Sequence, residues 1–429
     1  MHILFVSEYY PPKVMGGGEI NLSLLAQNLA QQGHTIYILT SKWKDLPKIE
    51  QQGNIAIHRT LTTGANPSSL MSNLKRSIHL ERSVIQEVTS LIQSKTIDLI
   101  HFTGISIIAA PHLKKLGKPL FATIESYPAL CPKGDRLYHG NSECTISCTL
   151  FKFITCQHNS SEIGKMKNKI YLKKNPLFLS YAYHHYQKLK KALPHCQLIA
   201  ISSYVQTLLQ KQGVSSTVIP NSLDLTPFLK SEKNKRVTKN SKIKILYLGS
   251  FLKSKGLHIL LEALQNTDFH CDLYGSGPLE LELKEYIQKY NLDATIHAPV
   301  PYDKIPTLYQ DADIVIFPSI WPEPFGRIAI EAIASGTYLI ASNIGGITET
   351  LKDHQNDHQA LLVPPGNASA LHQALNQARI TLKTKKNSKS NQEIKKQRSK
   401  LIVTLQEQYT PEKIAAQHLN IYQNITTGK

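Results

Sequence analysis

The segment from Phe317 to Gly346 reads FPSIWPEPFGRIAIEAIASGTYLIASNIGG and constrains the fold more strongly than the composition does. An apolar run ends at Phe317 and a Pro-rich loop follows. Apolar residues then recur at the period of a helix that begins near Arg327 and ends at Gly336. Residues 338–342 are again apolar and predict a strand. Strand, loop, helix and strand in this order predict a parallel α/β unit.

Two carboxylates flank the start of this helix. Glu323 lies in the preceding loop and Glu331 on the second helical turn. The helix N-terminus between them offers free N–H groups and a partial positive charge, which suits a diphosphate. Glu331 is then placed to accept hydrogen bonds from a ribose diol, and Glu323 from a second ring. Two solvated carboxylates on an ordinary α/β unit would give the same pattern, so the pair alone does not decide the function.

The neighbouring residues narrow the choice. The segment resembles the signature of retaining glycosyltransferases of family 4, roughly P-S-x-x-E-x-F-G-x-x-x-x-E-A-x-A-x-G followed by G-G-x-x-E. The chain matches this pattern at Pro318, Ser319, Glu323, Phe325, Gly326, Glu331, Ala332, Ala334, Gly336, Gly345, Gly346 and Glu349. The resemblance implies the α/β GT-B fold, in which two Rossmann-like domains face a cleft and a C-terminal helix crosses back to the N-domain.

The length of 429 residues is too great for one compact core and predicts two domains. We expect an N-terminal, acceptor-side domain over 1–225, a basic linker over 226–243, a nucleotide-sugar-binding domain over 244–410, and the crossing helix over 411–429. The sequence contains no run of 18 apolar residues and no signal-peptide pattern at its start, so we expect a cytoplasmic protein.

The net charge of +18 is compatible with nucleic acid, an anionic membrane surface or acidic small molecules as partners. No helix-turn-helix, zinc finger or RNA-binding aromatic motif accompanies the charge, so we do not expect nucleic acid. Basic residues gather in 381–400. They form either a solvated face or a site of attraction to anionic phospholipid, which would place the protein peripherally on the inner face of the membrane.

Two further motifs follow predicted strands in the second half. Gly249 to Gly256 resembles the family pattern G-R-x-x-x-x-K-G, and Gly275 to Pro278 resembles G-x-G-P. The resemblance implies that Lys255 neutralises the donor diphosphate and that Glu323 holds the donor sugar. The implied donor site also contains Gly17, Gly18, Gly249, Ser250, Gly275, Gly277, Phe325, Gly326, Arg327 and Glu331. Ser250 stands where the family has Arg, so one cation is missing.

The first half also departs from the family. Its Gly16-Gly17-Gly18 turn resembles the P-P-x-x-G-G-x-E entry of family 4, which borders the donor phosphates and the acceptor. The turn is not G-x-G-x-x-G, so a nicotinamide cofactor is disfavoured. After a predicted strand over 119–124, Glu125 occupies the place of a family His that faces the donor sugar. We therefore count Glu125 with Lys255 and Glu323 as a candidate catalytic residue.

Four of the six cysteines, Cys131, Cys144, Cys148 and Cys156, fall in an expected excursion of the N-domain near 130–160. Such a group can bind zinc. Its spacing is not the paired C-x-x-C of common zinc modules, so reduced thiols are slightly preferred over a metal site. A cysteine-containing insertion after a Cys-Pro pair also occurs in some family 4 relatives.

The resemblance implies a retaining, metal-independent hexosyltransferase that needs no cofactor. Its donor would be a nucleotide diphosphate sugar, and its acceptor a hydroxyl of a glycan or lipid-linked sugar in cell-surface polysaccharide, lipopolysaccharide or glycolipid synthesis. The departures at Glu125 and Ser250 leave an alternative open, a catalytically inactive GT-B domain that binds nucleotide sugar or glycan. The charge leaves a second alternative, a basic nucleic-acid-binding protein.

Overall fold

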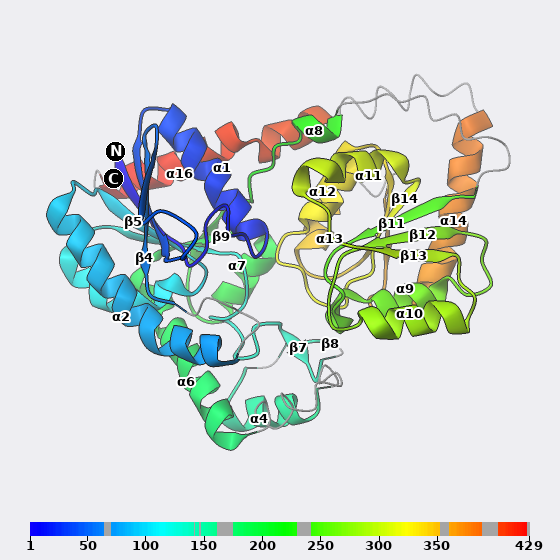
Figure 1. Cartoon of the computed structure of the whole chain (residues 1–429), viewed down its shortest axis with the longest axis horizontal. Helices are drawn as coiled ribbons and strands as arrows, with labels where there is room; N and C mark the ends of the chain where they lie inside the picture. Colours follow the sequence, from blue (N-terminus) through cyan, green and yellow to red (C-terminus); the bar gives the residue numbers. More distant parts are fainter. Residues whose placement is uncertain are drawn as a thin grey trace.

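The computed structural model describes residues 1–63, 70–140, 142–145, 147–160, 175–229, 242–351, 360–387 and 402–426. In these ranges the chain forms two α/β units that lie side by side, with the N- and C-terminal ends close together on one of them (Figure 1). We call these units the N-domain and the C-domain. The prediction of two Rossmann-like domains in a GT-B arrangement is confirmed.

The N-domain is built on an eight-stranded sheet in the order β10-β9-β6-β5-β1-β2-β4-β3. All neighbouring strands are parallel except β3, which pairs antiparallel with β4. The strands are β1 (His2–Val6), β2 (Thr35–Ser41), β3 (Ile49–Gln52), β4 (Ile55–Leu61), β5 (Leu99–Thr103), β6 (Leu120–Ile124), β9 (Gln197–Ala200) and β10 (Ser216–Val218). Strands β3 and β4 were not predicted, although alternate residues of β4 are buried in the period-2 pattern of a strand.

Helices cover both faces of this sheet because alternate residues of β1 point to opposite sides. Ile3 and Phe5 pack in a core with α1 (Gly17–Gln31) and α16 (Pro411–Thr426). Leu4 and Val6 pack in a core with α2 (Leu70–Ser94). The remaining helical segments are η1 (Gly104–Ala109), α3 (Ala110–Leu113), η2 (Lys114–Leu116), α6 (Pro176–Ala192), η3 (Leu193–His195) and α7 (Ser203–Gln210).

The C-terminal helix α16 lies on the N-domain, as predicted (Figure 1). Its Tyr422 is fully buried and its ring packs edge-on against Phe121, with 4.8 Å between the ring centroids. The Tyr422 hydroxyl also hydrogen bonds to Nδ1 of His101, and Nε2 of His101 lies 2.8 Å from Oγ1 of Thr123. His101 is therefore a packed structural residue.

The C-domain carries a six-stranded, fully parallel sheet in the order β13-β12-β11-β14-β15-β16. Its strands are β11 (Lys244–Leu248), β12 (His270–Tyr274), β13 (Ala294–His297), β14 (Ile314–Phe317), β15 (Tyr338–Ser342) and β16 (Ala360–Val363). Its helical segments are η4 (Lys253–Lys255), α9 (Leu257–Ala263), α10 (Glu280–Lys289), η5 (Tyr302–Lys304), α11 (Ile305–Asp311), α12 (Arg327–Ala334), α13 (Gly346–Leu351) and α14 (Ala368–Asn387).

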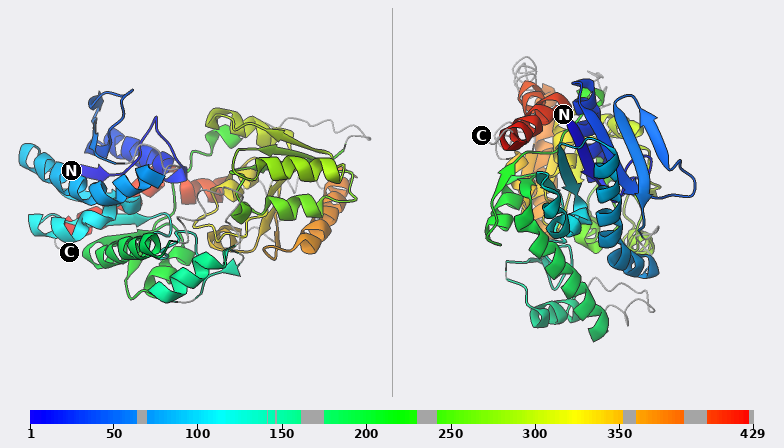
Figure 2. Two further views of the ribbon diagram at one scale, coloured as in Figure 1. Left: turned by 60° about the horizontal axis from the view of Figure 1, so that its bottom comes forward. Right: turned by 90° about the vertical axis from the view of Figure 1, so that its left-hand side faces the viewer.

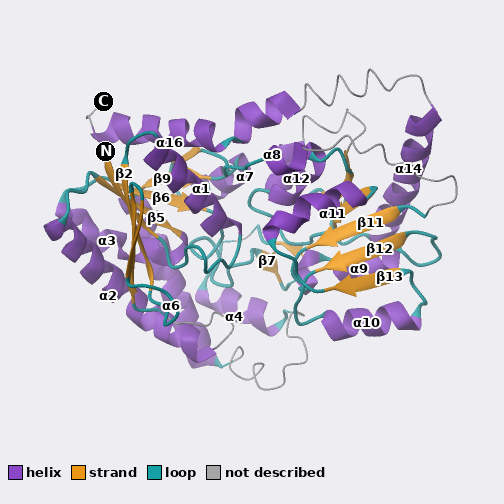
Figure 3. Cartoon of the chain, turned by 45° about the horizontal axis from the view of Figure 1, so that its top comes forward, coloured by secondary structure: helices purple, strands orange, loops and turns teal. Residues whose placement is uncertain are grey.

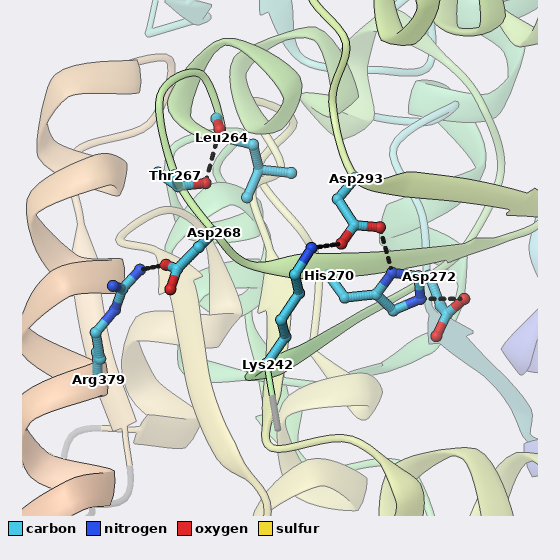
Figure 4. Close-up of polar contacts among 8 residues, drawn as sticks. All are labelled: Lys242, Leu264, Thr267, Asp268, His270, Asp272, Asp293 and Arg379. Carbon is cyan, nitrogen blue, oxygen red and sulfur yellow. Dashed lines mark hydrogen bonds and ion pairs between the residues drawn. The ribbon is translucent and has the colours of Figure 1, made fainter. Parts of the chain in front are cut away.

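Charged side chains tie together the amino ends of the C-domain strands (Figure 4). Asp293 accepts hydrogen bonds from Nζ of Lys242 at 2.7 Å and from Nδ1 of His270 at 2.8 Å. Nε2 of His270 lies 3.3 Å from Asp272. Arg379 of α14 pairs with Asp268. These pairs are partly exposed and contribute little each to stability.

Two segments connect the domains. Residues 219–229 leave the N-domain and end in the short helix α8 (Thr226–Leu229), whose Phe228 packs against Tyr309 of the C-domain with 5.7 Å between ring centroids. Residues 402–409 are helical and return the chain to the N-domain, and the Leu223 amide donates to the Tyr409 carbonyl at 2.7 Å. In Figure 1 the green helix α8 lies beside the red helical segment that precedes α16, and Figure 3 shows the same region with its top turned forward. Residues 230–241 of the expected linker lie outside the described residues.

An excursion leaves the N-domain sheet after β6 and packs against α6 (Figure 2). It contains the two-stranded hairpin β7 (Leu137–Tyr138) and β8 (Ser142–Glu143), followed by α4 (Leu150–His158). The ring of Phe153 in α4 stacks on Tyr183 of α6, with 6.2 Å between centroids. The excursion lies on the side of the N-domain that faces the C-domain.

Candidate functional site

The candidate donor site lies where three loops leave the carboxyl ends of β12, β11 and β14, which are neighbours in the sheet. Successive strands are added to one side of β11 as far as β13 and then to its other side from β14 onward, and parallel sheets bind ligands at such switch points. The loops contain Gly275 and Gly277 after β12, Gly249 to Lys255 after β11, and Pro318 to Gly326 after β14. The structure thus places most of the predicted donor residues at one edge.

The loops after β11 and β14 are joined through their backbones. The Ser254 carbonyl accepts hydrogen bonds from the amides of Ile320 at 2.9 Å and Trp321 at 3.0 Å. Gly256 has a φ of +72°, and a Cβ atom there would lie 1.9 Å from the Pro318 carbonyl oxygen. Only glycine permits both this backbone conformation and this approach. The position of Lys255 relative to Glu323 is therefore set by main-chain packing.

Lys255 and Glu323 form an ion pair between Nζ and Oε1. Their side chains are mostly buried, with 18% and 12% of their surface exposed. Burial raises the pKa of Glu323 and the Lys255 charge opposes that shift. Nζ of Lys255 also lies 4.3 Å from the centroid of the Trp321 ring, within cation–π range. The fold thus holds one ammonium group in a partly desolvated position at the switch point.

Glu331 is 3% exposed and lies on α12, where both its oxygens already accept hydrogen bonds. Oε1 accepts from the Tyr302 hydroxyl and from Nε of Arg327, both at 2.8 Å, and Oε2 accepts from Tyr309 at 3.1 Å. Tyr309 is fully buried, whereas Tyr302 and Arg327 lie nearer the surface. The sequence did not indicate the two tyrosines, which precede Glu331 by 29 and 22 residues.

The start of α12 is reached through Gly326, whose φ of +93° turns the chain into the helix. A Cβ atom at this position would lie 2.5 Å from Cγ1 of Ile347. The preceding Phe325, a predicted donor residue, is 6% exposed, and its ring packs edge-on against Tyr409 at 5.7 Å between centroids. Phe325 therefore supports the loop from within the core and connects it to the returning segment.

The remaining predicted donor glycines occupy turns with differing amounts of space. A Cβ atom at Gly277 would lie 2.6 Å from the Phe251 carbonyl oxygen, whereas Gly17, the first residue of α1, has nothing within 4 Å. The carbonyl of Ser250 accepts a hydrogen bond from the Tyr247 hydroxyl at 2.9 Å. Ser250 itself is exposed, so its short side chain leaves the position of the family arginine open to solvent.

Glu125 lies at the carboxyl end of β6 and is held against the start of α1. Its Oε1 accepts a hydrogen bond from Nδ2 of Asn21 at 3.1 Å, and a Cβ atom at Gly18 would lie 2.4 Å from its Oε2. Asn21 also accepts, through Oδ1, from the amide and the hydroxyl of Ser222 at 2.7 and 2.9 Å. Asn21 thus connects Glu125 to the interdomain segment, a role that the sequence reading missed.

Glu19 lies near Glu125 and also near Glu8. The pKa of Glu125 is raised to about 7, mainly by burial; the Asn21 hydrogen bond lowers it and the neighbouring charge of Glu19 raises it. Burial also raises the pKa of Glu8 to about 7, although Arg76, 3.5 Å away, opposes it. The Glu19 carboxylate accepts from the Gly16 amide at 2.8 Å at the start of α1. The N-domain side of the site is therefore acidic.

Tyr127 joins the two halves of the candidate site. It follows Glu125 by two residues and is fully buried. Its hydroxyl donates a hydrogen bond to the carbonyl of Pro322, the residue before Glu323, and its ring packs edge-on against Trp321 at 5.9 Å between centroids. The loop after β6 therefore touches the loop after β14. The motif Glu125-Ser126-Tyr127 was visible in the sequence, but not its partner.

Further contacts cross between the domains at the start of α7. The hydroxyl of Ser202 donates to the Pro324 carbonyl at 2.6 Å. The Glu349 carboxylate accepts from the amide and hydroxyl of Ser203 at 2.8 and 2.7 Å, and from the amide of Tyr204 at 3.3 Å. Glu349 belongs to the G-G-x-x-E part of the signature. In this structure it caps a helix of the opposite domain.

Within the described ranges, no three His, Cys, Asp or Glu side chains lie close enough together to hold a metal ion. The six cysteines are thiols, and Cys131, Cys144, Cys148 and Cys156 are all partly buried. They gather in the excursion. The basic stretch 381–400 is described only as far as residue 387, so most of the predicted lipid-contacting segment lies outside the described residues.

Two family models together match almost the whole chain. The model described as "Glycosyltransferase Family 4" matches residues 15–226, and "Glycosyl transferases group 1" matches residues 230–397. This chain belongs to the family 4 glycosyltransferases. The resemblance inferred from the Phe317–Gly346 segment is thereby confirmed.

Curated relatives of this family 4 chain are distant over its length and closer over part of it. An uncharacterized glycosyltransferase, MJ1607 of Methanocaldococcus jannaschii, is 22% identical over 380 residues, covering 83% of this chain and 84% of the relative. O-antigen chain mannosyltransferase C of Escherichia coli is 32% identical over 134 residues, covering 31% of this chain and 36% of that protein.

Solved structures of similar fold cover the whole family 4 chain. Sucrose-phosphate synthase from Thermosynechococcus elongatus superposes with a TM-score of 0.72 at 21% identity, covering 100% of both chains. Anabaena Alr3699/HepE in complex with UDP-glucose has a TM-score of 0.63 at 17% identity and covers 99% of this chain and 100% of its own. At these identities the likeness shows the GT-B fold. Among the helices described here, none is long and apolar enough to cross a bilayer.

Proposed function

We propose that this chain is a retaining glycosyltransferase that moves a hexose from a nucleotide diphosphate sugar to an acceptor hydroxyl. The acceptor belongs to cell-surface polysaccharide, lipopolysaccharide or glycolipid synthesis, as the O-antigen activity of one partial relative suggests. The UDP-glucose held by the similar HepE structure supports a nucleotide sugar donor. The observation that carries the proposal is the Lys255–Glu323 pair at the switch point of the C-domain sheet.

Exchange of partners explains why this pair suits donor binding. Before the donor binds, Glu323 neutralises Lys255 in a partly buried position. An arriving diphosphate carries more negative charge than the carboxylate and competes for the Lys255 ammonium group. Glu323 is then released to accept hydrogen bonds from sugar hydroxyls, which offset the cost of leaving its charge buried. The pair thus gives the site one group for the diphosphate and one for the sugar.

Catalysis in this proposal rests on positioning and on charge stabilisation at the departing diphosphate. The bond from the anomeric carbon to the phosphate oxygen breaks as the acceptor oxygen attacks the same face of the sugar. The acceptor proton moves to the departing phosphate oxygen. Lys255 and the N-terminus of α12 stabilise the charge that develops there. Glu331 exchanges its bonds from Tyr302 and Arg327 for bonds from the ribose hydroxyls.

Glu125 takes the acceptor-side role in this proposal. A carboxyl group with a pKa of about 7 is present both charged and neutral near neutral pH, so it can accept or donate a hydrogen bond. Thr123, Ile124 and Glu125 line a small cavity beside Gly104 and Leu189 in the N-domain. A sugar hydroxyl placed there would meet Glu125 in the place where the family has a neutral imidazole.

The decisive experiment offers the purified full chain a panel of UDP-, GDP-, ADP- and dTDP-sugars. Binding is measured by thermal shift and cleavage by release of nucleotide, and NMR of the product gives its anomeric configuration. We expect one nucleotide class to bind and its sugar to be transferred or slowly hydrolysed with retention. Inversion at the anomeric carbon would contradict the retaining mechanism.

The alternative is a catalytically inactive GT-B domain that binds nucleotide sugar or glycan, and the departures at Glu125 and Ser250 favour it. It predicts nucleotide binding without cleavage of any sugar in the panel. Glu125→His, which restores the family residue, separates the two functions further. The enzyme hypothesis predicts that this variant retains part of the activity, whereas a binding module has no activity to retain.

A further inference from the structure

The excursion brings four cysteines to one cavity. Cys131 follows β6, Cys144 follows β8, Cys148 precedes α4 and Cys156 lies within α4. All four side chains line the same cavity of about 20 Å³, with Leu137 and Phe153 forming part of its apolar wall. Three separate segments of the chain therefore meet at this cavity.

A backbone amide is directed at one of these sulfurs. The amide of His139 donates to Sγ of Cys156 at 3.4 Å. Metal-bound sulfur is regularly supported by such outer contacts.

The charges around the cavity also fit bound thiolates. Lys133 and Arg136 line it and are almost fully buried. Only 6% of the Lys133 side chain and 6% of the Arg136 residue are exposed. Arg136 also donates a hydrogen bond through Nη2 to the Cys144 carbonyl, so a cation is held beside one of the four cysteines.

We propose that Cys131, Cys144, Cys148 and Cys156 bind one zinc ion that holds the segments of the excursion together. Four thiolates in a tetrahedral arrangement are a preferred ligand set of structural zinc. The cavity of about 20 Å³ exceeds the roughly 10–15 Å³ that one water occupies and so admits a single ion. The sulfurs line the cavity without converging on one point, and rotation of the cysteine side chains closes them around the ion.

Binding releases the protons of the four thiols to solvent, and the ion compensates half of the resulting negative charge. Lys133 and Arg136 compensate part of the rest, since Lys133 also pairs with Asp135 at 3.1 Å. Zinc at this site takes no part in sugar transfer, because the sulfurs fill its coordination and leave no position for substrate.

The excursion requires stabilisation beyond what its apolar core supplies. Its apolar core is small, and Phe151 of α4 is 79% exposed while Leu130, Leu137 and Phe153 are buried. Small units with little core are commonly stabilised by a metal. Glu143 of β8 accepts a hydrogen bond from the Tyr204 hydroxyl at the start of α7. The zinc ion would therefore also fix the edge of the N-domain that borders the interdomain contacts.

The test uses the untagged full chain, produced in zinc-supplemented medium and purified without chelator. We expect about one zinc per chain by mass spectrometry, and X-ray absorption at the zinc edge to give four sulfur ligands at about 2.3 Å. Cys148→Ser should lose most of the zinc, and amide exchange over residues 131–156 should become faster. Cys196→Ser is the matched control, since Cys196 lies outside the excursion, and it should keep the metal. Nucleotide binding should persist in Cys148→Ser.

Three results would overturn the assignment. Wild-type protein without bound metal would do so, as would fewer than three sulfur ligands in the absorption spectrum. Iron in place of zinc, visible by its colour, would replace the zinc assignment with an iron site. The wild-type measurements decide the matter even if Cys148→Ser fails to fold. Because the readouts are metal content and ligand type, they are independent of whether the chain transfers sugar.

Discussion

The two sides of the candidate site are built by different means. On the C-domain side, the donor loops are short and their backbones touch, as at Gly256 and Pro318. On the N-domain side, the arrangement depends on side-chain contacts between distant segments, such as Glu125 with Asn21 and Asn21 with Ser222. The first side departs from the family pattern at the exposed Ser250, and the second departs from it at Glu125. Backbone packing tolerates few substitutions, and side-chain networks can exchange one polar residue for another.

The sharpest test of this difference is Gly256→Ala. The substitution adds a Cβ atom 1.9 Å from the Pro318 carbonyl and forces alanine to a φ of +72°. We expect a loss of roughly 3–5 kcal/mol in the free energy of unfolding, from backbone strain and overpacking together. Urea denaturation measures it, and nucleotide binding should fall with the loop.

Gly366→Ala is the control for backbone strain alone. Its φ of +73° matches that of Gly256, but its nearest neighbour, Cγ2 of Ile320, is 3.7 Å from a Cβ atom. This variant should lose only about 1–2 kcal/mol. Equal losses in the two variants would contradict the view that close packing of the loops fixes the donor side.

Lys255→Ala should lower kcat by roughly 10²–10³-fold, because the ammonium group acts mainly on charge that develops in the transition state. The donor affinity should change less. Lys253→Ala is the control, since Lys253 belongs to the same turn and carries the same charge. A loss confined to donor affinity, with kcat intact, would show that Lys255 is a binding group only.

Glu331→Gln should weaken nucleoside diphosphate binding by roughly 1–3 kcal/mol, because the neutral amide is a poorer acceptor for the ribose diol. Isothermal titration calorimetry measures the loss. Tyr302→Phe removes one donor to Glu331 without touching the carboxylate, so its effect on affinity should be small or favourable. Unchanged affinity in Glu331→Gln would remove Glu331 from the ribose site.

The acidic N-domain side predicts a pH dependence of stability that a variant of Glu125 can test. The folded chain keeps a proton on Glu125 up to a pH of about 7, whereas the unfolded chain releases it near the ordinary pKa of 4.5. The free energy of unfolding therefore falls as the pH rises through this window, by up to roughly 3 kcal/mol for the group. Glu125→Gln cannot ionise and should give a flatter profile.

Glu285→Gln is the control for this profile, since Glu285 lies exposed on α10. It should leave the pH dependence of stability unchanged. Thermal melts between pH 4 and pH 8 compare the variants. A wild-type profile as steep as that of Glu125→Gln would show that Glu125 ionises normally.

The smallest effect is expected at the interdomain cap. Glu349→Ala removes the acceptor of two amides at the start of α7 and should cost about 1 kcal/mol in stability, as for other helix caps. Donor affinity should stay the same, because the change acts between the domains. Glu412→Ala is the control, because it removes an exposed glutamate from the first turn of α16 and not a cap that crosses between the domains. A large loss of donor affinity in Glu349→Ala would place Glu349 in the donor site.

The sequence alone determined the features that local rules govern. Apolar periodicity and the spacing of glycines and carboxylates between Phe317 and Gly346 indicated the strand, the loop, the helix and the family. The same signals placed Lys255 and Glu323 at the ends of two parallel strands. Strands β3 and β4 were missed, although the alternation in β4 was visible.

Only the tertiary structure decided which side chains meet across the chain. Tyr302 and Tyr309 reach Glu331, Asn21 reaches both Glu125 and Ser222, and Tyr127 reaches Pro322. It also showed that the Phe325 ring is buried and gathered the four cysteines around one cavity. Local patterns fix the backbone of each element, whereas these contacts depend on how the elements pack, and packing is set by the whole chain at once.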